Sequence, residues 1–176
     1  MELLIATEFQ PKPIIRALLE HDVDFVLIGG LAGMARGSSY PSFDVDIAYA
    51  RDDENLERLA AALRELGATL RGAPNDVAFQ LDAQTLKNGS HFTFDTGYGS
   101  LDILSDPDGA PAYRKLKQEA GPPQEIEGEP IRVATLDHLI AMKEASGRTK
   151  DKLMATEYRV LADELRAPSD ESSELG

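Results

Sequence analysis

Two aspartates, Asp44 and Asp46, stand one residue apart in FDVDIAYA, a run that alternates apolar and polar residues as a β-strand does. Phe43, Val45 and Ile47 are predicted on one face of that strand, and both carboxylates project from the other. Two or three carboxylate oxygens at short range are typical ligands of Mg²⁺ or Mn²⁺, with phosphate and water completing the octahedron. The alternative is a half-exposed strand whose aspartates face only water.

A glycine pair precedes this strand. Gly29 and Gly30 end the apolar run DFVLI and lead into a short predicted helix, LAGMAR. Glycine allows the backbone to approach a ligand closely, and a helix N-terminus offers free N–H groups to an anion. The pair therefore indicates a phosphate site beside a metal site, and the alternative is a tight turn that binds nothing.

A third acid, Asp102, lies in the predicted strand GSLDILS, where it alternates with Leu101 and Ile103 and so faces away from the core. Neighbouring strands lie about 4.8 Å apart. If this strand lies beside residues 43–50, the three carboxylates converge on a site suited to two metal ions.

Composition narrows the classes of protein to consider. The chain has 176 residues, 42% of them hydrophobic, which is enough for a buried core, and no apolar run approaches the roughly 18 residues of a membrane span. The N-terminal MELLIATEFQ is acidic where a signal peptide is positive, so we expect a cytoplasmic protein. Zero cysteines exclude disulfides and thiolate zinc sites. A net charge of −13 weighs against a general nucleic-acid binder, although a metal ion can accompany a small phosphorylated ligand.

The predicted elements form one domain over residues 1–166, followed by a polar, acidic tail over 167–176 that we expect to be disordered. Helices are predicted in KPIIRALLEHDV, LAGMAR, DDENLERLAAALRELGA and DGAPAYRKLKQEA, and a helical C-terminal part over 136–166, with Thr135 as an N-cap. Strands are predicted in DFVLI, FDVDIAYA, HFTFDT and GSLDILS, and a hairpin in QEIEGEPIRVAT. The segments ATLRG and DVAFQLD carry no clear pattern and are assigned to no element. This order predicts an α/β (α+β) fold, a mixed sheet flanked by helices with a helical C-terminal end.

These motifs together resemble a known family. The GG pair, a 13-residue interval, DVDI and the later LDIL strand resemble the nucleotidyltransferase fold of the DNA polymerase β type. The segment LDHLIAMKEASGRTKD is similar to bacterial nucleotidyltransferases of the AbiEii-like toxins, which belong to toxin–antitoxin systems. The resemblance covers about residues 12–165.

The resemblance implies roles for individual residues. It makes Asp44, Asp46 and Asp102 the metal-binding and catalytic carboxylates, with Asp102 orienting or deprotonating the attacking hydroxyl. It further implies that the nucleotide is contacted by Gly29, Gly30, Ser42, Lys143, Lys150 and Asp151. The two glycines would contact its triphosphate. The implied cofactor is Mg²⁺ or Mn²⁺.

Three positions depart from the family pattern. Relatives often carry Arg where Tyr40 stands and Thr where Ser42 stands, and many carry a further Asp near Met154. The change at Tyr40 removes a fixed positive charge near the phosphates. The metal-binding carboxylates are all present.

The resemblance implies Mg²⁺-dependent transfer of a nucleoside monophosphate from an NTP to a hydroxyl acceptor. A tRNA end, a protein or a small molecule fits as the acceptor. The resemblance also implies a toxin that has a cognate antitoxin. The alternative is a catalytically degenerate module of the same fold with a binding or regulatory role. A Rossmann site is excluded because the glycines do not have G-x-G-x-x-G spacing, and a P-loop because no G-K-[ST] follows.

The basic residues and the histidines can have either functional or purely structural roles. Lys143, Arg148, Lys150 and Lys152 form the most basic stretch of an acidic chain, and they indicate either a phosphate contact or an ordinary solvated helix face. The basic YRKLK (113–117) indicates either an acceptor surface or nothing special. The three histidines have no ligand spacing, so we expect surface or capping roles for them.

Overall fold

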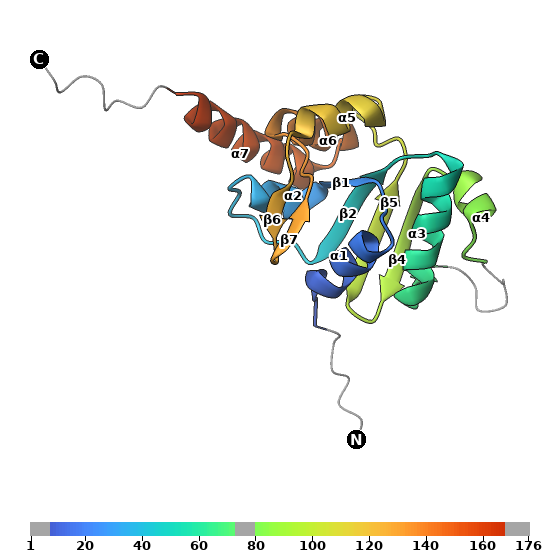
Figure 1. The fold of residues 1–176 in the computed structure, drawn as a ribbon. Coiled ribbons are helices and arrows are strands. Elements are labelled where there is room, and N and C mark those ends of the chain that lie inside the picture. The colour runs from blue at the N-terminus through green and yellow to red at the C-terminus, as the bar shows by residue number, and fades with distance from the viewer. Residues whose placement is uncertain (1–7, 73–79, 168–176) are drawn as a thin grey trace, which may run out of the picture.

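The computed structural model describes residues 8–72 and 80–167 and has a mixed α/β architecture (Figure 1). The strands are β1 (Phe25–Ile28), β2 (Asp44–Tyr49), β3 (Thr69–Leu70), β4 (His91–Thr96), β5 (Gly99–Leu104), β6 (Gln124–Ile126) and β7 (Glu129–Ile131). The helices are α1 (Pro11–Glu20), α2 (Gly29–Ala35), α3 (Asp53–Glu65), α4 (Ala83–Lys87), α5 (Tyr113–Ala120), α6 (Leu136–Ser146) and α7 (Thr149–Arg166). The predicted fold class, a mixed sheet flanked by helices, is confirmed.

The main sheet has five strands in the order β1-β2-β5-β4-β3. Its central pair, β2 and β5, is parallel, and the other pairs are antiparallel. A parallel pair needs a long crossover, which α3, β3, α4 and β4 supply. Two predicted strands far apart in the sequence therefore become neighbours at the centre of the sheet.

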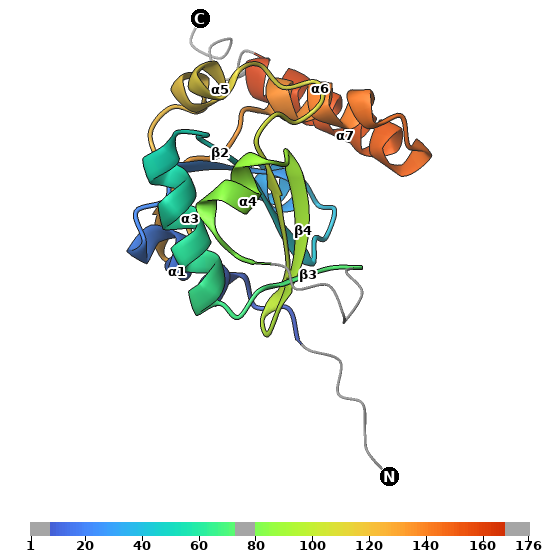
Figure 2. The ribbon, with the colours of Figure 1, turned by 90° about the vertical axis from the view of Figure 1, so that its right-hand side faces the viewer.

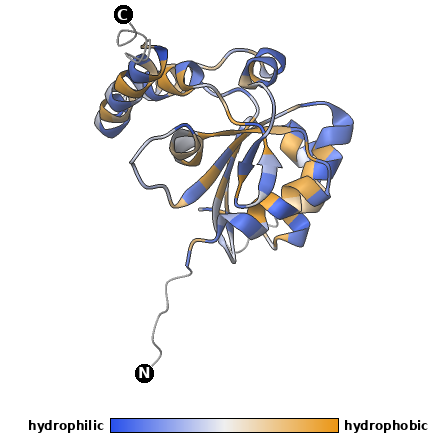
Figure 3. Cartoon of the chain, turned by 60° about the vertical axis from the view of Figure 1, so that its left-hand side comes forward, coloured by the Kyte–Doolittle hydropathy of each residue, from blue (hydrophilic) through white to orange (hydrophobic). Residues whose placement is uncertain are grey.

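A large part of the core lies on one face of this sheet. Val45, Ile47, Leu101, Ile103 and Phe94 alternate with polar residues along their strands and are fully buried. Helices α1 and α3 pack together on that side (Figure 2). The flanking helices carry both hydrophobic and hydrophilic residues, as amphipathic helices with one buried face do (Figure 3).

The C-terminal helices lie at one end of the sheet and are tied to it by backbone hydrogen bonds. The Leu27 N–H donates to Arg132 O at 2.8 Å, and the Ala134 N–H donates to Leu27 O at 3.0 Å. The side chain of Arg36, the residue after α2, donates to Val133 O at 2.7 Å and to Ala134 O at 3.1 Å. These bonds fix the segment that leads into α6, where the Thr135 hydroxyl accepts from His138 N–H at 3.1 Å, so its predicted N-cap role is confirmed.

The structure differs from the sequence prediction in two places. Phe43 was predicted on the buried face and is instead 72% exposed, because strand pairing begins only at Asp44. Helix α4 was not predicted; Asp82 caps it by accepting from Thr85 N–H at 2.8 Å. Most of DVAFQLD and nearly all of the predicted tail lie outside the described residues. Within the described ranges, no helix combines the length and the apolar character needed to cross a membrane.

Candidate active site

Three carboxylates meet on the face of the sheet opposite the core. The parallel register places Asp46 directly beside Asp102, and Asp44 lies two residues earlier on the same face. Each residue offers a carboxylate oxygen, and the three oxygens lie within 4.8 Å of one another. The sequence predicted that the three carboxylates would converge if their two strands were neighbours, and the structure has this arrangement.

The charges of these three residues are poorly compensated by the protein. Burial raises the pKa of Asp46 to about 8, and the neighbouring negative charges of Asp44 and Asp102 act in the same direction, while Lys143 opposes them. One oxygen of Asp102, Oδ1, is buried and accepts no hydrogen bond from any described residue. A set of carboxylate oxygens with an unsatisfied acceptor fits a hard divalent cation such as Mg²⁺ or Mn²⁺.

The glycine pair makes room for two of the site side chains. Gly29 has a φ of +72°, and a Cβ there would lie 2.2 Å from Oδ2 of Asp46. A Cβ on Gly30 would lie 2.6 Å from Oγ of Ser42, whose hydroxyl in turn donates to Asp44 Oδ1 at 3.3 Å. Any larger residue at either glycine would therefore displace a group of the acid site, which is a physical reason for the motif in addition to the predicted triphosphate contact.

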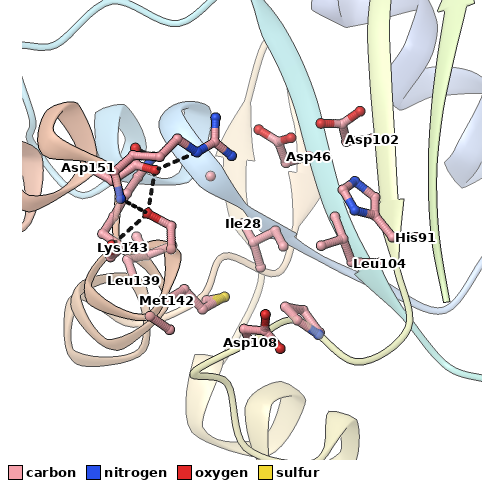
Figure 4. Close-up of a pocket in the computed structure, with 15 residues that line it drawn as sticks. Ile28, Asp46, His91, Asp102, Leu104, Asp108, Leu139, Met142, Lys143 and Asp151 are labelled. Carbon is pink, nitrogen blue, oxygen red and sulfur yellow. Dashed lines mark hydrogen bonds and ion pairs between the residues drawn. The ribbon is translucent and has the colours of Figure 1, made fainter. Parts of the chain in front are cut away.

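A cavity of about 390 Å³ lies between this end of the sheet and helix α6 (Figure 4). Its polar lining residues include Asp46, His91, Asp102, Asp108, Lys143, Ser146, Arg148 and Asp151. Its apolar lining residues include Ile28, Leu104, Leu139 and Met142. The cavity thus joins two of the three acids on the sheet to the basic residues of the C-terminal helices.

Asp151 organises the cationic side of the cavity. Its carboxylate accepts from Ser146 Oγ at 2.6 Å, pairs with Lys143 Nζ at 3.2 Å, and lies 3.6 Å from Arg148 Nε. Burial alone would raise the pKa of Asp151, but the Ser146 hydrogen bond and the Lys143 charge together hold it below its usual value. Asp151 therefore stays ionised and holds Lys143 at the wall of the cavity.

The other predicted site residues lie near the cavity without lining it. Asp44 is the first residue of β2, Ser42 lies two residues before it, and Gly30 lies directly against the Ser42 side chain. Lys150 is exposed on α7 and is not part of the cavity lining. The structure thus brings Lys143 and Asp151 to the acids and leaves Lys150 outside.

His91 and Asp108 line the cavity, although neither was singled out for it. His91 was expected to have a surface role, and the β4–β5 register places it two residues from Thr93, the partner of Asp102, on the face of the acids. Only the register of this hairpin could have revealed that placement. Asp108 lies in a loop with no periodic pattern, so the sequence carried no signal for it.

Two features from the sequence prove to be structural. In YRKLK, the Tyr113 hydroxyl donates to Asp24 Oδ1 at 2.7 Å and Lys117 pairs with the same oxygen at 2.9 Å, which anchors α5 to the start of β1.

Met154 is buried in α7, and Tyr40 packs against the core. Neither lines the cavity, so the departures from the family pattern lie outside its walls.

Solved structures of nucleotidyltransferase-fold proteins share the fold of this chain. The crystal structure of ANT(2'')-Ia in complex with adenylyl-2''-tobramycin matches with a TM-score of 0.56 and 19% identity, over 88% of this chain and 87% of that one. The solution structure of the same antibiotic-resistance factor gives a TM-score of 0.55 at 19% identity, over 88% of this chain and 82% of that one.

A Thermotoga maritima protein with a proposed nucleotidyltransferase activity gives a TM-score of 0.53 at 17% identity, over 88% of this chain and 91% of that chain. The sequence matches no known family model. It also matches no curated protein. The structural likeness therefore establishes the fold of the chain.

Proposed function

We propose that this chain is a nucleotidyltransferase that transfers a nucleoside monophosphate from an NTP to a hydroxyl acceptor and releases pyrophosphate. The observation that carries the proposal is the convergence of Asp44, Asp46 and Asp102, with the unsatisfied buried oxygen of Asp102 among them. The nucleotidyltransferase fold of the chain supports it. Two of these carboxylates line a cavity that has Lys143 on its opposite wall, an arrangement that suits a triphosphate accompanied by a divalent cation.

The three aspartates would hold Mg²⁺ or Mn²⁺. When bound, such an ion neutralises phosphate oxygens and favours ionisation of the acceptor hydroxyl. In the transfer, the acceptor oxygen forms a bond to the α-phosphorus as the bond to pyrophosphate breaks in line with it. Asp102 would accept the hydroxyl proton, and Lys143 would place its positive charge against the charge developing on the phosphates.

Smaller contributions come from the remaining predicted residues. The backbone of Gly29 and Gly30 and the Ser42 hydroxyl would contact the triphosphate beside the metal site. Asp151 acts through Lys143, which it orients. Lys150, outside the cavity, would contribute only from its rim.

The acceptor of the nucleoside monophosphate belongs to one of three classes. ANT(2'')-Ia, at 19% identity, has been solved with an adenylylated aminoglycoside, and its likeness makes a small cationic molecule one candidate for this chain. A tRNA end or a protein hydroxyl suits the same chemistry. The net charge of −13 weighs against nucleic acid. The similarity of LDHLIAMKEASGRTKD to AbiEii-like proteins supports a toxin with a cognate antitoxin.

A degenerate module of the same fold is a second candidate, favoured by Tyr40 and Met154 at positions where relatives carry charged residues. Transfer of label separates the two. The protein is incubated with α-³²P-labelled NTPs and Mg²⁺ together with bulk tRNA, a mixed protein fraction or an aminoglycoside. We expect label in one acceptor class, and none with the folded Asp44→Asn/Asp46→Asn variant. Undiminished labelling by that variant would contradict the proposal.

A further inference from the structure

A polar cluster built on Arg71 continues the face of the acids beyond the cavity. On β4, His91 lines the cavity, and Thr93 is the strand partner of Asp102. Asp95, a member of the cluster, lies two residues further along the same face, a step of about 7 Å. Arg71 itself does not line the cavity. The cavity and the cluster therefore lie on opposite sides of the acids along the strands.

Arg71, the residue after β3, is held across three strands. Its backbone N–H donates to Thr93 O at 2.9 Å. Its side chain donates to Asp95 Oδ1 from Nε at 3.1 Å and from Nη2 at 2.5 Å. The same Nη2 also donates to Ser100 Oγ on β5. These bonds run along the sheet and hold the planar guanidinium in one orientation over β4 and β5.

The guanidinium lies beside two of the metal-binding acids. Ser100 is the strand partner of Asp44, and neighbouring strands lie about 4.8 Å apart. The hydrogen bond to Asp95 raises the pKa of Arg71, and the negative charges of Asp102 and Asp44 act in the same direction. Arg71 is therefore within electrostatic reach of these acids from the side away from the cavity.

The proposed transfer makes this side the approach of the acceptor. In-line displacement places the entering oxygen and the leaving pyrophosphate on opposite sides of the α-phosphorus. The triphosphate lies between the acids and Lys143 in the proposed function, so pyrophosphate leaves into the cavity and the acceptor enters from the side of Arg71. The side chains of Arg71 and Asp95 are about half exposed there, and α1 and α3 lie on the opposite side of the sheet (Figure 2).

The pair of Arg71 and Asp95 carries no net charge, which restricts what it can recognise. Because the two groups neutralise each other, neither a cation nor an anion is strongly favoured. Both side-chain bonds reach Oδ1 of Asp95, so its Oδ2 can accept a further hydrogen bond, and Nη1 of Arg71 can donate. A hydroxyl group accepts and donates at once, so it fits this pair.

We propose that Arg71 and Asp95 bind the acceptor through a hydroxyl next to the reacting one, so that the acceptor carries a vicinal diol. The inference rests on the proposed nucleotidyl transfer. One hydrogen bond of about 2.9 Å and the width of a diol bridge the strand spacing between Asp44 and the guanidinium. The ribose at an RNA end and the ring of a sugar carry such a diol, whereas serine, threonine and tyrosine side chains do not.

Transfer of label from α-³²P-labelled NTPs in Mg²⁺ tests this recognition with two kinds of acceptor. An RNA that ends in ribose is compared with the same RNA ending in 2′-deoxyribose, and an aminoglycoside is compared with its deoxy analogues. The acceptor that is labelled distinguishes an RNA end from a sugar. For that acceptor, kcat/KM should be about tenfold lower when the neighbouring hydroxyl is missing, because one hydrogen-bonded contact to a charged pair is lost.

Arg71→Met should raise the KM for the diol acceptor by about tenfold and should no longer distinguish it from the deoxy analogue. The dissociation constant for the NTP should change little, since Arg71 lies outside the cavity. Transfer that continues without this preference cannot come from misfolding.

Arg58→Met is the matched control, because it removes another half-exposed arginine from an ion pair, with Glu54 on α3 at 3.6 Å. It should retain the preference for the diol. Three results would overturn the inference and leave the proposed function in place: equal use of the diol and its deoxy analogue by the wild type, an unchanged preference in Arg71→Met, or labelling confined to protein. If no acceptor is labelled, both fail.

Discussion

The two sides of the cavity are positioned by different kinds of interaction. On the sheet side, the places of Asp44, Asp46 and Asp102 follow from the backbone register of β2 and β5. On the helical side, Lys143 owes its place to one side-chain ion pair with Asp151. Backbone pairing is cooperative across the whole sheet, whereas a single ion pair depends on two side chains.

A side-chain anchor also joins the helical side to the loop that leads into the acids. Glu157 of α7 accepts from Ser38 Oγ at 3.2 Å and from Ser39 N–H at 3.2 Å. Ser38 itself accepts from Tyr40 N–H at 3.2 Å. Changes on the sheet side should therefore abolish the reaction, whereas changes on the helical side should weaken nucleotide binding by smaller steps.

The largest effect is expected at the acids. Asp46→Asn should lower turnover by about a thousandfold, because it removes a carboxylate from the proposed metal site. The fold should persist, since Asn is isosteric with Asp. Metal-dependent label transfer measures turnover, and circular dichroism verifies the fold. Turnover within a few-fold of the wild type would show that Asp46 does not hold a metal ion for this reaction.

A smaller loss is expected at the lysine. Lys143→Met should raise the dissociation constant for the NTP by about tenfold, because a partly buried charge-assisted contact is lost. Lys150→Met is its control, as Lys150 is exposed outside the cavity lining. Calorimetry should show little change for the control. A larger loss at Lys150 than at Lys143 would place the triphosphate elsewhere.

The stability of the metal-free protein should depend on the ionisation of Asp46. With a folded pKa of about 8, against an unfolded value of about 4, folded Asp46 retains a proton that the unfolded chain releases between these pH values. The free energy of unfolding should therefore fall as pH rises from about 4 to 8. Urea denaturation in EDTA measures it, and Asp46→Asn, which carries no charge in either state, should be more stable than the wild type at pH 8. A flat difference across this range would show that Asp46 ionises normally.

The smallest effect is expected at the anchor between α7 and the loop. Glu157→Gln keeps the size of the side chain and weakens the hydrogen bonds from Ser38 and Ser39, so stability should fall by about 1 kcal/mol. NTP affinity should fall by about two- to threefold through the loop before Asp44. Denaturation and calorimetry give the two values. An NTP affinity equal to that of the wild type would confine Glu157 to a role in stability.

The sheet side was largely predictable from the sequence. Alternation placed Asp44 and Asp46 on one face and Asp102 on the corresponding face of another strand, because a strand has a fixed period of two. Phe43 failed the same rule because strand pairing begins only after it, at Asp44. The sequence could not establish that β2 and β5 are neighbours, since a crossover of four elements separates them.

The helical side and the end of the cavity near Asp108 were less predictable from the sequence. The resemblance supplied Lys143 and Asp151, but the periodicity of the helices could not show that Lys143 faces the acids and Lys150 does not. His91 depends on the register of a hairpin, and Asp108 on the packing of a turn against α6. Contacts of this kind arise from tertiary packing and leave no local pattern.

The most direct measurement is a calorimetric titration of NTPs with and without Mg²⁺, performed on the wild type and on Asp44→Asn/Asp46→Asn. The account predicts that the wild type binds at least one NTP only when Mg²⁺ is present, and that the double variant binds none under the same conditions. NTP binding by the wild type that is independent of Mg²⁺ and unchanged in the double variant would contradict a metal-dependent nucleotide site at these aspartates.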